Sequence, residues 1–125
     1  MRITIKLGSY EVRASLFDTP TGSALYNALP IESTANTWGD EIYFETPVHT
    51  GLESDARAET AVGDLAFWPP MSAFCIFFGP TPASIDDTPM AASEVNIVGK
   101  LDHPEPDSLR KIRAGESIRI AKADE

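Results

Sequence analysis

FWPPMSAFCIFFGPTP, residues 67–82, contains five aromatic side chains, four prolines and the only cysteine of the chain. If its centre is a β-strand, alternation sends Phe74, Ile76 and Phe78 to one face and the residues between them to the other. Both faces are then apolar, which is typical of a central strand covered on each side by a helix, a loop or a partner chain. We therefore expect the first set to fill the protein interior.

The residues at the two ends of this stretch predict the edges of a groove on its outer face. Proline has no N–H group for a β-ladder, so the two prolines after Trp68 end the preceding strand. At the other end, Thr81 lies in a Gly-Pro-Thr-Pro turn at residues 79–82. The sequence thus predicts an outer groove beside Trp68, Phe77 and Thr81.

Further β-type runs recur on both sides of this stretch, separated by turn residues. With few helices to cover it, the sheet must either pair with a second sheet or close into a barrel. We favour a barrel plugged by helices. The runs cover residues 2–7, 10–16, 41–46, 64–68, 73–78, 94–101 and 116–122.

Two short helices are predicted between these runs. The first begins at a cap, Asp18 or Thr19, has a proline in its first turn and ends before the next proline. The second covers residues 108–113 and is capped by Asp107 or Ser108.

Composition favours a single domain over residues 1–125, which is long enough to bury a core without disulfides or metal. The net charge of −9, from 19 acidic and 10 basic side chains, argues against nucleic acid as a partner. The longest apolar run is too short for a membrane span, and residues 1–7 alternate like a strand rather than a signal peptide. A lone cysteine makes no internal disulfide, so we expect a cytoplasmic protein.

Two segments resemble parts of the cyclophilins. VRASLFDTPT, residues 12–21, is similar to the cyclophilin hairpin that ends in Leu-Phe and leads into the first helix. VNIVGKL, residues 95–101, is similar to the strand that ends in Phe-Gly-Lys-Val, and residues 109–112 then match the start of the second helix.

A closer resemblance, over nearly the whole chain, is to a small prokaryotic cyclophilin-like family. Its motifs are present here as NTWGDEIYF at residues 36–44, Gly63-Asp64 with Trp68-Pro69-Pro70, and FFGPTP at residues 77–82. The resemblance implies a mostly β fold, a cyclophilin-like closed eight-stranded β-barrel with one or two short helices. It implies no established activity.

Prolyl isomerases of the cyclophilin fold carry a Phe-His-Arg motif whose arginine polarises the substrate amide. The comparable segment here is Tyr43-Phe44-Glu45, without arginine. An ionised carboxylate cannot donate a hydrogen bond, so prolyl isomerase activity is not expected unless Arg57 reaches the site from a loop.

Glu41, Tyr43 and Glu45 alternate with apolar residues and therefore share one face of their strand. They are candidates for one wall of a pocket, although a solvated strand face is the commoner role of charged residues. Trp38 and Trp68 are candidates for the same pocket, with core packing as the alternative explanation.

No pattern in the sequence predicts a metal, a cofactor or covalent catalysis. His49 and His103 have no partners at metal-ligand spacing. Cys75 lies in an apolar run, where a small inert hydrophobe is expected rather than a nucleophile.

These observations predict a binding module for a small ligand or an extended peptide. Two alternatives remain. The first is an enzyme, either a divergent prolyl isomerase or an acid/base enzyme using Glu41 or Glu45 with Tyr43. The second is a structural subunit that buries its aromatic side chains against a homodimer mate or another protein. A deep pocket holding both glutamates would favour the enzyme, and a flat apolar patch the subunit. The predicted ligand-binding residues are Trp38, Glu41, Tyr43, Glu45, Trp68, Phe77 and Thr81.

Overall fold

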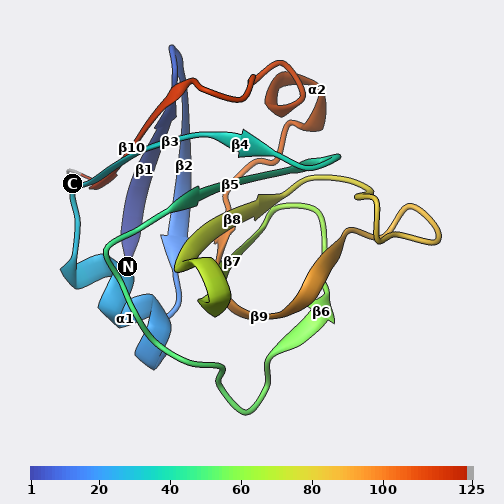
Figure 1. The fold of residues 1–125 in the computed structure, drawn as a ribbon. Helices are drawn as coiled ribbons and strands as arrows, with labels where there is room; N and C mark the ends of the chain where they lie inside the picture. The colour runs from blue at the N-terminus through green and yellow to red at the C-terminus, as the bar shows by residue number, and fades with distance from the viewer. Residues whose placement is uncertain (124–125) are drawn as a thin grey trace.

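The computed structural model describes residues 1–123, which form a mostly β fold with two short α-helices (Figure 1). The helices are α1 (Pro20–Asn27) and α2 (Pro106–Leu109), and a 3-10 turn, η1, covers Pro69–Met71. The strands are β1 (Arg2–Leu7), β2 (Tyr10–Leu16), β3 (Ile31–Thr34), β4 (Asn36–Thr37), β5 (Glu41–Glu45), β6 (Arg57–Glu59), β7 (Asp64–Trp68), β8 (Ala73–Phe77), β9 (Met90–Leu101) and β10 (Ser117–Lys122).

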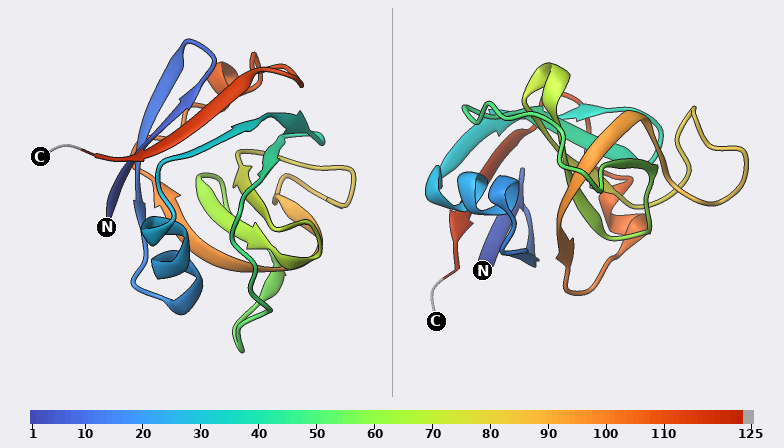
Figure 2. Two further views of the ribbon diagram at one scale, coloured as in Figure 1. Left: turned by 60° about the vertical axis from the view of Figure 1, so that its left-hand side comes forward. Right: turned by 90° about the horizontal axis from the view of Figure 1, so that it is seen from below.

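All ten strands belong to one strongly curved sheet (Figure 2). Its hydrogen-bonded order is β3-β10-β1-β2-β9-β7-β8-β5-β4, and β6 pairs with β9. All of these pairs are antiparallel.

The sequence predicted a closed barrel of eight strands, whereas the structure has ten strands in a sheet that is not closed. The ladder is open between β3 and β4, its two end strands. Ala35 separates them, and its N–H group and carbonyl still bond to Glu116 and Gly115 beside β10. Residues 36–37 then pair with β5 instead. Residues 31–37 therefore form one bent segment that pairs with β10 through β3 and with β5 through β4. The two end strands of the sheet are joined by the backbone at Ala35 and not by hydrogen bonds between them.

β8 is buried along its whole length and separates two apolar clusters. Phe74, Ile76 and Phe78 belong to the large central core, where the Phe74 ring stacks on Phe44 at 5.2 Å between centroids. Cys75 and Phe77 belong to a smaller cluster on the opposite face. The alternation predicted for this strand is confirmed, and Ala91 and Val95 from the N-terminal part of β9 pack on its second face.

Helix α1 packs against β2 and β9 and contributes Leu25 to the central core. Its start is confirmed, because the Thr19 hydroxyl caps it by accepting the N–H group of Gly22 at 3.0 Å. Figure 2 shows this helix beside the mouth of the curved sheet, next to the N-terminus.

Helix α2 begins earlier than expected and ends earlier. Pro106 occupies its first turn and Glu105 precedes it without a side-chain cap, so neither Asp107 nor Ser108 is the cap. A proline at the first helical position needs no N–H partner, which makes this earlier start favourable. Leu109 and Ile112 are nevertheless buried together in the core.

A buried amide holds the long segment between β5 and β6 against the rest of the fold. The Asn96 side chain on β9 donates to the Thr21 hydroxyl and to the Gly51 carbonyl, each at 3.0 Å. Its oxygen accepts the N–H group of Glu53 at 2.8 Å. Buried amides are stable when their donors and acceptors are paired, as these are. Neither helix of the described residues has the length and apolar character needed to span a bilayer.

The central core makes a direct stability prediction. Replacing Phe74 or Phe78 by alanine should lower the free energy of unfolding by about 3–5 kcal/mol, because each change leaves a cavity in a closely packed interior. Chemical denaturation measures this loss. The control is Phe17→Ala, whose ring is 43% exposed and whose removal should change stability by roughly 0.5 kcal/mol or less. Equal midpoints for Phe74→Ala and Phe17→Ala would contradict the core assignment.

Candidate functional site

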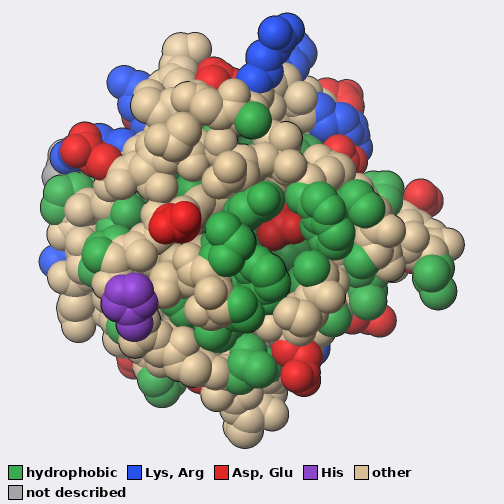
Figure 3. All heavy atoms as spheres, viewed as in Figure 1, with side chains coloured by type: hydrophobic (Ala, Val, Ile, Leu, Met, Phe, Trp, Pro, Cys, Tyr) green, Lys and Arg blue, Asp and Glu red, His purple; other side chains and the backbone are tan. Residues whose placement is uncertain are grey.

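A pocket of about 260 Å³ lies on the second, outer face of β5, β7 and β8, beside the start of β9. In the space-filling view, hydrophobic side chains surround a hollow that has an acidic side chain in its floor (Figure 3). The acidic residue among those lining the pocket is Glu41. The full lining is Trp38, Glu41, Tyr43, Trp68, Met71, Ala91, Ala92 and Val95.

Strand register explains why these side chains meet. Residues directly opposite one another in antiparallel strands lie on the same face of the sheet. On β8, Phe77 is opposite Glu41 and Cys75 is opposite Tyr43, while Ala73 is opposite Trp68 of β7. The side chains of Glu41, Tyr43 and Trp68 therefore stand around the smaller apolar cluster.

Trp38 reaches the pocket from the tight turn between β4 and β5. Trp38 and Glu41 exchange backbone hydrogen bonds of 3.0 and 3.2 Å, which leaves Gly39 and Asp40 as a two-residue turn. Gly39 has a φ of +59°, which glycine adopts without strain in this type of hairpin. A side chain there would also collide with the loop beneath, since a Cβ would lie 2.8 Å from the Cα of Thr81.

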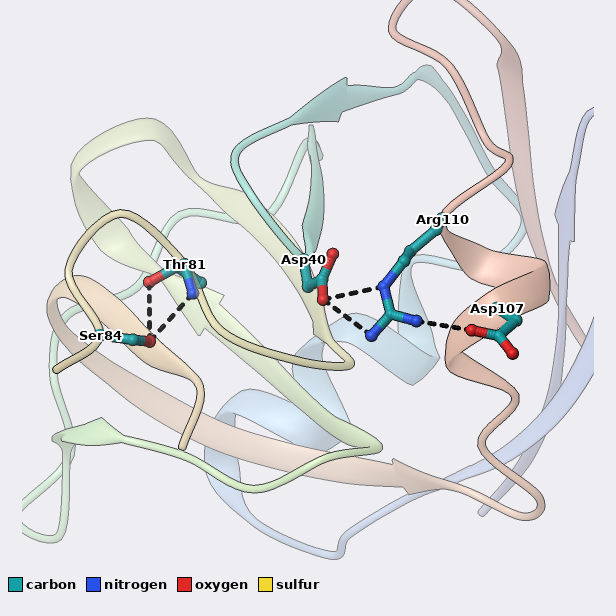
Figure 4. A network of polar contacts seen from close by, with 5 residues as sticks. All are labelled: Asp40, Thr81, Ser84, Asp107 and Arg110. Atoms are coloured by element: carbon teal, nitrogen blue, oxygen red, sulfur yellow. Dashed lines mark hydrogen bonds and ion pairs between the residues drawn. The ribbon is translucent and has the colours of Figure 1, made fainter. Parts of the chain in front are cut away.

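Asp40, at the tip of the same turn, is clamped by Arg110 (Figure 4). Two nitrogens of the Arg110 guanidinium lie 3.0 Å from one Asp40 carboxylate oxygen, and a third donates to Asp107 at 2.7 Å. That Asp40 oxygen also lies against Gly79, where a Cβ would be 2.2 Å away. The turn that carries Trp38 is thus held from two sides, by the end of α2 and by the loop after β8.

Thr81 lies outside the pocket lining and stabilises the loop that leads into β9. Its hydroxyl donates to the Met90 carbonyl at the start of β9. Its N–H group donates to the Ser84 hydroxyl at 2.9 Å (Figure 4). The Ser84 hydroxyl donates in turn to the Thr88 carbonyl at 2.7 Å. These bonds fold residues 81–90 back on themselves and fix where β9 begins.

Trp68 is held by a hydrogen bond at its polar end. Its indole Nε1–H donates to the Ser93 hydroxyl at 2.7 Å, which fixes the ring next to β9. Ala91 and Ala92 on the same strand have short side chains, and so the space in front of the ring stays open. A tryptophan with one apolar face and one satisfied N–H group is suited to an exposed binding wall.

Glu41 is the unusual member of the lining, because its residue surface is only 7% exposed. Within residues 1–123, no N–H or O–H group donates a hydrogen bond to its carboxylate, and its side-chain partner is the Cys75 thiol. Loss of solvation raises the pKa of Glu41 from 4.5 to about 7, and the hydrogen bond from Cys75 opposes this only in part. Burial and the neighbouring carboxylate together raise the pKa of the Cys75 thiol.

Of the seven predicted site residues, the structure brings four together in this pocket: Trp38, Glu41, Tyr43 and Trp68. Glu45 is exposed at the end of β5, in a separate polar depression with Asn36. Phe77 is fully buried beneath the pocket and Thr81 lies within the loop. The solvated strand face therefore describes Glu45 and not Glu41.

Four lining residues were missing from the sequence prediction: Met71, Ala91, Ala92 and Val95. Met71 belongs to η1, directly after the two prolines, and so was adjacent to a predicted boundary. Ala91 and Ala92 lie on β9 before residue 94, where the predicted strand began, and Val95 lies just inside that predicted strand. The run of small and polar residues that begins β9, MAASE, shows no alternation that would predict a strand.

The guanidinium considered for a prolyl isomerase mechanism does not reach this pocket. Arg57 is exposed on β6, and its Nε–H donates to the Glu59 carbonyl at 3.1 Å. Neither arginine nor lysine is among the lining residues. Across residues 1–123, no group of three or more His, Cys, Asp or Glu side chains is arranged to hold a metal ion.

The raised pKa of Glu41 predicts a specific pH dependence of stability. Between about pH 4.5 and 7 the unfolded chain ionises this carboxyl while the folded chain keeps it protonated, so stability falls as pH rises. Relative to Glu41→Gln, the wild-type protein should lose roughly 3 kcal/mol of unfolding free energy across this range.

Denaturant unfolding at several pH values measures the difference between the two proteins. The matched control is Glu45→Gln, on the same strand but exposed, which should keep the wild-type pH dependence. Parallel curves for wild type and Glu41→Gln would show that the Glu41 carboxyl is not desolvated.

Comparisons with known proteins agree with this fold. The model of a family described as Cyclophilin-like matches residues 1–121. The solution structure of a hypothetical protein from Archaeoglobus fulgidus is similar over 98% of this chain and 95% of its own, with 39% sequence identity and a TM-score of 0.82. Comparison with curated proteins gave no match.

Proposed function

Because this chain belongs to the Cyclophilin-like family, we propose that it uses the family's fold as a binding module for a small ligand. The ligand would occupy the pocket between Trp38, Tyr43 and Trp68, with Glu41 in its floor. The observation that carries this proposal is the buried Glu41 carboxylate, to which no N–H or O–H group of residues 1–123 donates. Buried carboxylates normally accept hydrogen bonds from N–H or O–H groups, whereas the side-chain partner of Glu41 is the weakly donating Cys75 thiol. Such a carboxylate at the base of an aromatic hollow favours an additional, stronger partner from outside the chain.

The shape of the pocket supports a small ligand over a protein surface. Its volume of about 260 Å³ is just below the usual range for drug-sized molecules, which suits a compact ligand or a single side chain of a peptide. A structural subunit would present a flat apolar patch, whereas this surface is hollowed and has a carboxyl group at its base (Figure 3). The net charge of −9 also disfavours polyanionic partners.

A second candidate function is acid/base catalysis by Glu41. A carboxyl group with a pKa of about 7 can both give and take a proton near neutral pH, and the Tyr43 phenol lines the same pocket. Glu45, however, lies outside the pocket, so a mechanism with two carboxylates has no second member there. We therefore place ligand binding first.

Blocking the pocket tests the proposed function. Trp38 and Trp68 are the only two tryptophans of the chain and both line the pocket, so intrinsic fluorescence reports directly on its occupation. A library of small molecules would be screened by fluorescence and by NMR chemical shifts. Ala92→Phe should abolish binding of the hits, because the added ring enters the space in front of the tryptophans.

The matched control is Ala114→Phe, which adds the same ring at an exposed position of the turn before β10 and should leave binding intact. Hits that bind equally well to Ala92→Phe would show that this pocket is not the ligand site. Self-association lost in Ala92→Phe would instead support the structural subunit.

Prolyl isomerase activity is not expected of this pocket. Catalysis must lower a barrier of about 18–20 kcal/mol by favouring the twisted amide over the planar one. No guanidinium or ammonium group lines the pocket to stabilise that state, and its one carboxylate has the opposite charge. A protease-coupled assay on a Xaa-Pro peptide should therefore show the uncatalysed rate, and a rate near that of a cyclophilin assayed in parallel would contradict this.

A further inference from the structure

We infer that the ligand of this pocket is a small organic cation with apolar substituents, held by the Glu41 carboxylate and by the faces of Trp38, Tyr43 and Trp68. This inference rests on the proposed function and specifies its ligand class. It follows from the uncompensated charge of Glu41, from the aromatic lining and from the poor fit of other ligand classes.

The charges around Glu41 leave a place for a cation. None of the lining residues is lysine, arginine or histidine, and Tyr43 is the other titratable group among them. Beneath the pocket, the buried Cys75 of β8 is a neutral thiol. An ionised Glu41 therefore has no counter-charge in this site, and bringing a positive group into contact with it would compensate its lost solvation.

Three aromatic rings in the lining favour a cation that also carries apolar groups. A cation above the face of tryptophan or tyrosine is attracted by the ring quadrupole, most strongly when both are desolvated. Ser93 fixes the Trp68 ring, and the clamp on Asp40 fixes the turn that carries Trp38. Because both walls are held in place before binding, less conformational entropy is lost when a ligand enters.

Other ligand classes fit the same lining less well. An anion would approach a carboxylate with no basic group to receive it. Calcium and magnesium require several oxygen ligands, whereas Glu41 is the sole carboxylate among the lining residues. A neutral ligand of the same shape would fill the space but would leave an ionised Glu41 uncompensated.

Cation binding is linked to the ionisation of Glu41. In the free protein its pKa is about 7, so near neutral pH part of the population is protonated. A cation binds the ionised form, and therefore binding releases a proton and strengthens as pH rises towards the plateau above that pKa. Between about pH 6 and about pH 8 the affinity should rise roughly tenfold.

Two pairs of compounds with matched shapes test the ligand class. Choline would be compared with 3,3-dimethylbutan-1-ol, its neutral carbon analogue, and benzylamine with benzyl alcohol. Each compound is titrated against the intact chain, with tryptophan fluorescence and NMR chemical shifts as readouts. Calorimetry in buffers of different ionisation enthalpy counts the protons released on binding.

At least one cation should bind with roughly 30-fold higher affinity than its neutral partner, as expected for a desolvated ion pair combined with aromatic contacts. Glu41→Gln should remove that preference, the proton release and the pH dependence together, while Glu45→Gln should retain all three. Trp68→Leu should lower the affinity for the cation more than the affinity for the alcohol. Circular dichroism of each variant checks that it is folded.

The possible failures of this inference and of the proposed function are distinguishable. If a cation and its matched alcohol bind equally well, and both fail to bind Ala92→Phe, the inferred cationic ligand class is wrong. The pocket would then still be a binding site, but for neutral ligands. If neither cation binds at concentrations up to its solubility limit, the inferred cationic ligand class is also wrong. The small-molecule screen with Ala92→Phe then decides separately whether the pocket binds any ligand.

Discussion

Burial of β8 on both faces is the constraint on which the rest of the structure depends. A strand with large apolar side chains on each side requires two covering layers, and most antiparallel sheets provide only one. Here the curved sheet folds around Phe74, Ile76 and Phe78, while the first half of β9 curls over Cys75 and Phe77. The second layer is thin, formed partly by alanines, and the pocket lies where it stops short of covering the face completely.

The site follows from how that second layer is anchored. Three separate sets of polar contacts surround the pocket. They are the bonds from Arg110 to the β4–β5 turn, the hydrogen bonds of Thr81 at the start of β9, and the hydrogen bond from Trp68 to Ser93. Each holds the backbone or one end of a side chain and leaves the apolar faces free. The consequence is a rigid aromatic wall around Glu41, a carboxyl group that the fold removes from water without giving it a strong donor.

Much of the framework could be predicted from local pattern. β1, β2 and β7 have the bounds that alternation and turn residues indicate, and α1 begins at its threonine cap. The strands that escaped prediction are short or lack alternation: β3, β4, β6 and the first half of β9. Their pairing is determined by partners far away in the chain, as where Arg57 of β6 meets Val95 of β9. The open ladder at Ala35 likewise depends on how two distant strands share one segment.

The sequence by itself determined which residues share a face, because a strand's side chains alternate whatever surrounds it. That rule placed Phe74, Ile76 and Phe78 together, and it placed Glu41 with Tyr43. Only the tertiary structure decided how deep each of them lies. Glu41 is buried and Glu45 exposed on the same face of one strand, since the curl of β9 and the turn of Trp38 cover one end of β5 and leave the other in solvent. Solvation, and with it the pKa of a carboxyl group, is a property of everything packed around it, and no local pattern encodes that.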